Sequence, residues 1–126
     1  MAVINVRPKM IEDLSNSLNN GSNANTGTNF KVPAGKRWLI DVIELISNTA
    51  ATTVDCDIQI DIDDGGSPEN IYPQIDNFLN LRVDLASVYP RAVEMEATDN
   101  LEVKFTNTSG GTIIWGARIF VIERDV

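Results

Sequence analysis

The sequence changes character at Phe30. Residues 15–29 are rich in Asn, Gly and Ser and contain one large apolar side chain, Leu18. So few apolar groups cannot offset the entropic cost of ordering the backbone, roughly 1 to 2 kcal/mol per residue. From Phe30 to Val126 the chain is instead an unbroken succession of strand and turn signals. We therefore predict a flexible N-terminal arm or linker over residues 1–28 and one β domain over residues 29–126.

The clearest strand signal lies at residues 54–63, where apolar and polar side chains alternate strictly. This two-residue period is typical of a half-buried strand. Cys56 lies in the apolar row, so we expect a buried and shielded thiol. Residues 36–46 are almost continuously apolar, which favours a long strand in the middle of a sheet, with a bulge where the alternation slips.

The rest of the domain shows weaker strand signals of the same kind. Alternation at residues 92–97 and 101–105, around a tight turn at 98–100, predicts a hairpin. Residues 71–85 are irregular, which indicates a long connection followed by one strand. The last strand, residues 112–124, is apolar on both faces. We expect the domain's own second sheet to cover one face, and a subunit or partner to cover the other.

These signals add up to six to eight strands between Phe30 and Val126, without a convincing amphipathic helix. The predicted fold class is all-β: an antiparallel β-sandwich of jelly-roll type with an extended N-terminal arm.

Charge and cysteine content restrict the partners and the compartment. The chain has 18 acidic and 10 basic side chains and a formal net charge of -8, which repels phosphate backbones and anionic lipid. We therefore expect neither nucleic acid nor a membrane as the main partner. The single Cys56, the lack of an apolar run long enough to span a bilayer and the absence of a signal-peptide pattern predict a protein made in the cytosol.

The residue types needed for catalysis are scarce. The sequence contains no His, the usual general base and the commonest metal ligand. We predict no enzymatic activity and no cofactor. A Ca²⁺ site stays open as an alternative, because carboxylates cluster near one turn, at Asp61, Asp63, Asp64 and Glu69. Calcium needs six to eight converging oxygens, whereas carboxylates on a flat strand diverge, so a solvated acidic face or a patch for a basic partner is favoured.

Two further features bear on binding. Tyr72 and Tyr89 each precede a Pro in predicted loops, where aromatic side chains could bind a sugar, although a packing role is favoured. Basic residues gather in the arm and at the first turn of the domain: Arg7, Lys9, Lys31, Lys36 and Arg37. They would either pair with the protein's own carboxylates or dock that end onto an acidic surface.

Residues 29–124 resemble a known family. The segment Phe30-Lys31-Val32-Pro33-Ala34-Gly35-Lys36-Arg37-Trp38-Leu39-Ile40, the Thr98–Leu101 turn before Glu102-Val103 and the closing Gly110-Gly111 turn are similar to small β-sandwich virion proteins of tailed bacteriophages. The most similar kind is the head-decoration, or cement, protein. The resemblance implies a non-enzymatic homotrimer on the outer surface of the virion capsid, made in the host cytoplasm, with an extended arm that contacts the major capsid protein.

On this interpretation the arm supplies apolar and charged contacts to capsid subunits, and the first turn of the domain adds further charge. The expected partner-binding residues are Val3, Ile4, Val6, Arg7, Lys9, Met10, Ile11, Lys31, Lys36 and Arg37. The alternative function is a carbohydrate- or receptor-binding β-sandwich module of a phage tail or adhesin, with its site on Tyr72 and Tyr89.

Overall fold

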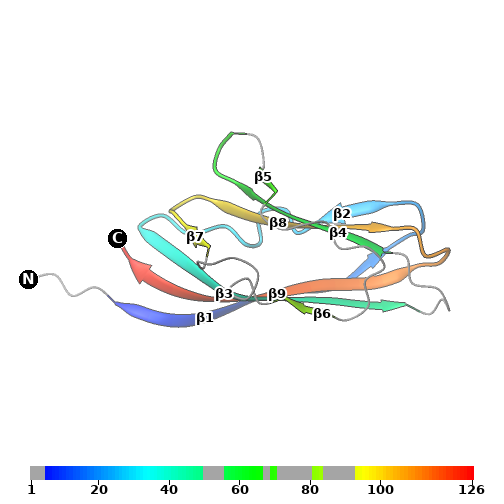
Figure 1. The fold of residues 1–126 in the computed structure, drawn as a ribbon, viewed down its shortest axis with the longest axis horizontal. Coiled ribbons are helices and arrows are strands. Elements are labelled where there is room, and N and C mark those ends of the chain that lie inside the picture. Colours follow the sequence, from blue (N-terminus) through cyan, green and yellow to red (C-terminus); the bar gives the residue numbers. More distant parts are fainter. Residues whose placement is uncertain (1–4, 50–55, 67–68, 71–80, 84–92) are drawn as a thin grey trace, which may run out of the picture.

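The structure is a computed structural model that describes residues 5–49, 56–66, 69–70, 81–83 and 93–126. These residues form two antiparallel sheets packed face to face (Figure 1). Sheet A has the order β1-β9-β3-β6, with β7 also paired to β3, and sheet B has the order β2-β8-β4-β5. The strands are β1 (Val6–Leu18), β2 (Asn23–Asn25), β3 (Lys36–Thr49), β4 (Cys56–Asp63), β5 (Glu69–Asn70), β6 (Leu81–Val83), β7 (Glu94–Met95), β8 (Asn100–Asn107) and β9 (Ile113–Asp125).

The strand order is that of a jelly roll. The first strand of each sheet pairs with one of the last two strands of the chain, β1 with β9 and β2 with β8, and the chain passes repeatedly from one sheet to the other. The predicted all-β sandwich is therefore confirmed. Seven of the described strands lie between Phe30 and Val126, within the predicted number. None of the described residues forms a helix that could cross a membrane.

The prediction of a flexible arm is wrong for the described part of residues 1–28. Residues 6–18 form β1, which pairs with β9 along almost its whole length, and residues 23–25 form β2 on β8. The sandwich therefore begins at β1, and a domain boundary at residue 28 would cut through both sheets. The segment is ordered by strand partners distant in sequence, and its own composition carries no sign of them.

The two strongest strand predictions are confirmed. β3 lies between β9 and the short strands β6 and β7, and its register on β9 shifts between Ile40 and Val42, where the alternation slips. β4 buries Cys56, Ile58 and Ile60 against the opposite sheet. The core between the sheets includes large side chains from both, with Phe105 and Trp115 stacked at 4.7 Å between ring centroids.

The predicted hairpin of residues 92–105 is wrong. β7 pairs with β3 in sheet A, whereas β8 pairs with β4 and β2 in sheet B, so the chain crosses between the sheets at residues 96–99. The crossing turn has Thr98 at φ 70° and a hydrogen bond from the Glu96 amide to the Asp99 carboxylate. Met95 and Leu101 are both fully buried, and they enter one core from opposite sides. Alternation of apolar and polar residues shows that a strand has a buried face, but it does not show which sheet the strand joins.

Candidate interaction surface

The candidate surface belongs to sheet A and starts from the alternation of side chains along β1. Residues opposite one another in an antiparallel pair project from the same face. Arg7 and Lys9 therefore share the inner face with their β9 partners Glu123 and Val121, both of which are buried. The even-numbered residues 6–12 project from the outer face, which points away from sheet B.

On the inner face, the basic residues of β1 contact Glu123. Its side chain is 3% exposed and accepts a hydrogen bond of 2.7 Å from the Trp38 indole N–H. It also pairs with the Arg7 guanidinium, and with Lys9 Nζ at 3.4 Å. Lys9 Nζ lies 5.8 Å from the centre of the Trp38 ring, within reach of a cation–π interaction. These contacts fasten the N-terminal half of β1 to the central strands.

The electrostatics of this cluster follow from its contacts. Burial alone would raise the pKa of Glu123, but the hydrogen bond from Trp38 and the positive charges of Lys9 and Arg7 outweigh it, so its pKa lies below the usual value. The pKa of Asp125 is also lowered, chiefly by the hydrogen bond from Lys36. Both carboxylates are thus charged partners for basic residues of the same chain.

The basic residues predicted to bind a partner therefore have mostly internal roles. Arg7, Lys9 and Lys36 pair with Glu123 or Asp125, and Arg37 lies 3.5 Å from Glu94. Lys31 is exposed and lines a small polar hollow at one end of the sandwich. Of the predicted apolar contacts, Ile11 packs against the core, whereas Val6 and Met10 lie on the outer face. Val3 and Ile4 lie outside the described residues.

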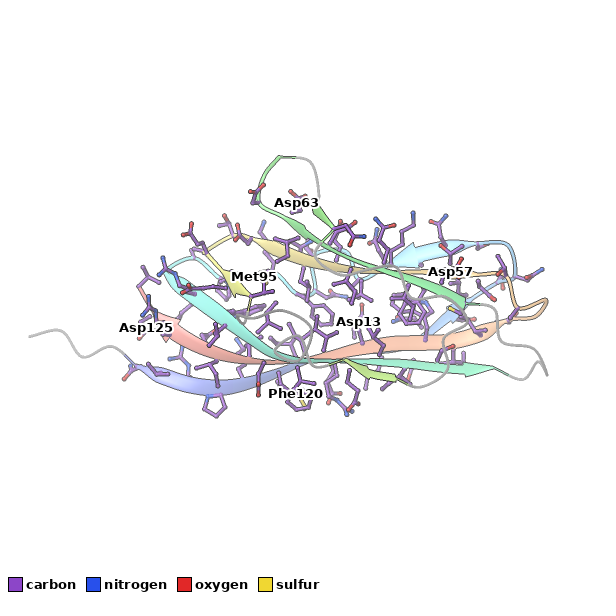
Figure 2. All side chains as sticks on the ribbon, viewed as in Figure 1. Asp13, Asp57, Asp63, Met95, Phe120 and Asp125 are labelled. Carbon is purple, nitrogen blue, oxygen red and sulfur yellow. The ribbon has the colours of Figure 1, made fainter. Side chains whose placement is uncertain are left out.

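The outer face of sheet A carries an apolar strip across its three longest strands. Pro8, Ile122 and Leu39 lie side by side in one row, and Met10, Phe120 and Val42 lie in the next. Phe120 points away from sheet B in Figure 2. We call Val6, Pro8, Met10, Leu39, Val42, Phe120 and Ile122 the outer strip. Three of its members are exposed large hydrophobic residues: Val6 at 62%, Met10 at 49% and Leu39 at 40%.

The surface of the outer strip is uneven. One hollow of about 170 Å³ is lined by Val6, Leu39 and Ile122, with Arg37, Glu94 and Arg124 at its edge. A second hollow of about 300 Å³ includes Pro8, Met10, Phe120 and Ile122 in its lining, together with Asp41. Projecting side chains and hollows thus lie next to each other on one face.

Charges of both signs surround the outer strip. Beyond the Met10 row, Arg118 pairs with Glu12 at 3.1 Å and with Glu44 at 2.8 Å. Beyond the Pro8 row, Arg124 lies opposite Arg37, a like-charge neighbour that pairs with Glu94 at 3.5 Å and with Glu96 at 3.6 Å. Within the described part of the chain, Arg124 and Asp41 form no ion pair, and both are exposed. A cation and an anion without an ion-pair partner among the described residues therefore lie on the same face.

The other sites considered from the sequence have less support. Asp63 and Asp64 each accept a hydrogen bond from a backbone amide two residues ahead, and Asp61 accepts one from Gln59. Among the described residues no three or more His, Cys, Asp or Glu side chains cluster as a metal would require. The side chain of Glu69 lies outside the described set, as do Tyr72 and Tyr89, so the calcium and sugar alternatives stay predictions.

The fold and the outer strip define a class: a jelly-roll sandwich with an exposed apolar face on an acidic body. Comparison with protein-family models and with curated protein sequences gave no match.

Proposed function

We propose that the protein is a non-enzymatic virion component that decorates and stabilises a bacteriophage capsid as a homotrimer bound to the major capsid protein. The observation that carries the proposal is the outer strip. A protein with a net charge of -8 is well solvated elsewhere, and an exposed apolar patch on such a surface marks a place for another protein. The jelly roll, a fold found among viral capsid domains, supports this proposal by analogy alone.

The N-terminal end of β1 joins the outer strip to the shell in this proposal. Val6 is both the first residue of β1 and the most exposed large hydrophobic member of the strip. Ile4 and Val3 come two and three residues earlier, a chain length of at most about 11 Å. Apolar contacts made by these residues on capsid subunits would therefore be continuous with the strip.

The experiment is co-sedimentation of the purified protein with tailed-phage shells assembled without their own decoration protein. The proposal predicts saturable binding at a fixed number of copies per shell, and a rise in the temperature at which loaded shells open. Deletion of residues 1–4 is expected to weaken binding, since it removes Val3 and Ile4 and leaves β1 intact.

Failure to bind any shell in a panel of such capsids would contradict the proposal. Binding to a glycan array, abolished by Tyr72→Ala or Tyr89→Ala, would contradict it in favour of the carbohydrate-binding alternative.

A further inference from the structure

We propose that the outer strip is the face through which copies of this chain contact one another. This inference rests on the oligomeric part of the proposed function and assigns it to named residues. The strip is formed by the outward side chains of β1, β9 and β3, the three longest strands of the described structure. It is therefore the outward face of a sheet, a surface that can pack against strands of another subunit.

The burial of Val42 shows how the strip is built. Its side chain is 5% exposed, yet it is not part of the core cluster between the sheets. Val42 shares its row with Phe120 and Met10, two other apolar side chains of the outer face. The strip thus contains a buried apolar side chain as well as exposed ones.

Charge favours a second copy as the occupant. A strongly acidic partner would meet Asp41 and Glu94, and a strongly basic one would meet Arg37 and Arg124. A copy of this chain brings both signs, so the Arg124 of one subunit can pair with a carboxylate such as Asp41 of the next. The edge of the strip therefore carries charges of both signs, so that different parts of it on neighbouring copies can pair with one another, as the heterologous contacts of a trimer require.

The shape of the outer strip also favours a second copy as its occupant. The exposed side chains of Val6 and Leu39 form part of the wall of the first hollow, and that of Met10 forms part of the wall of the second. A neighbouring copy offers both the side chains to fill these hollows and the hollows to receive the side chains. Exposed hydrophobic groups would then be removed from water on each subunit, which favours association.

The test compares two apolar positions of sheet A with similar exposure. Leu39, in the strip, is 40% exposed, and Ile114, near the other end of β9, is 43% exposed. Ile114 is six residues from Phe120, which is about 20 Å along a strand. The inference predicts that Leu39→Glu converts the trimer to monomer in sedimentation velocity, whereas Ile114→Glu leaves the trimer intact.

Circular dichroism and thermal unfolding of each variant separate loss of assembly from loss of fold. If Leu39→Glu does not fold, Met10→Glu makes the same test from β1. A trimer that survives folded variants at both positions would overturn the inference.

The shell assay distinguishes this inference from the proposed function. A wild-type monomer that binds shells, and loses binding on Leu39→Glu, would assign the strip to the capsid instead of a second copy. That result would overturn the inference and leave the decorating role standing. A trimer that dissociates as predicted but binds no shell would support the inference and contradict the decorating role.

Discussion

At the scale of single residues, Glu123 links the N-terminal strand β1 to the central strands of sheet A. Its carboxylate is nearly buried, accepts a hydrogen bond from the Trp38 N–H and forms ion pairs with Arg7 and Lys9. Glu123→Ala would leave the indole N–H unpaired, so we expect the free energy of unfolding to fall by about 1–3 kcal/mol in urea titrations. The control, Glu12→Ala, removes a more exposed ion pair with Arg118 and should change stability by at most about 0.5 kcal/mol. Equal losses of unfolding free energy in the two variants would contradict this role of Glu123.

The same carboxylate predicts how stability depends on pH. The folded-state pKa of Glu123 is below its usual value of 4.5, so folding favours the charged form. The contribution of Glu123 to stability is complete above about pH 4.5 and is lost as the pH falls through the folded-state pKa. The wild type should therefore lose more stability between pH 7 and pH 3 than Glu123→Gln does. Parallel unfolding curves for the two proteins would show that Glu123 is not the group responsible.

Gly116 is a second position where one residue decides the geometry. The register of β1 on β9 shifts so that Leu14 and Ser15 together oppose Gly116, and Ser15 adopts φ 63°. A Cβ at position 116 would lie 2.7 Å from the Asp13 carbonyl oxygen. Gly116→Ala must therefore displace β1, and we expect a loss of about 1–3 kcal/mol in thermal unfolding. An unchanged melting temperature would mean that the bulge yields at no cost.

At the scale of strands, β1 belongs to the sandwich, and truncation should demonstrate it. Deletion of residues 1–5 removes none of the described strands, so circular dichroism should still show a folded β protein with cooperative unfolding. Deletion of residues 1–18 removes all of β1, leaves the edge of β9 without its partner and takes away Arg7 and Lys9. We expect that chain to be unfolded or aggregated. A soluble, cooperatively folding protein without residues 1–18 would contradict this account of β1.

The sequence predicted the strands that carry their own hydrophobic signal. β3, β4 and β9 bury a continuous row of apolar side chains, and such rows are visible without a structure. β1 lacks this signal because its inward positions include Arg7 and Lys9, whose charges are acceptable there only because Glu123, more than a hundred residues later, lies opposite. Pairing between strands so far apart in the sequence depends on the topology of the fold, which local sequence patterns do not show.

The candidate site was predictable to a similar degree. The two apolar faces of the last strand indicated an outward surface, and Val6 and Met10 were expected to make contacts. The basic residues were assigned to a partner because their internal carboxylates could not be located from the sequence. Leu39 was not expected at the site, since a central strand with continuous apolar content does not show which side chains face outwards.

At the scale of the whole molecule, the chain combines an acidic body with one apolar face. In the proposed assembly, the acidic surface would keep free subunits apart in solution, and the outer strip would give them one direction in which to associate. The proposed trimer would also place three N-terminal strands on one particle, so that weak contacts from each would combine on a shell.

Light scattering of the unmodified protein over a range of concentrations would give its mass in solution, and with it the number of chains in the particle. Each chain has a mass of 13.8 kDa. The account predicts a particle of three times that mass, stable on dilution, with the outer strip buried between subunits. A particle of one chain mass at every concentration would contradict it.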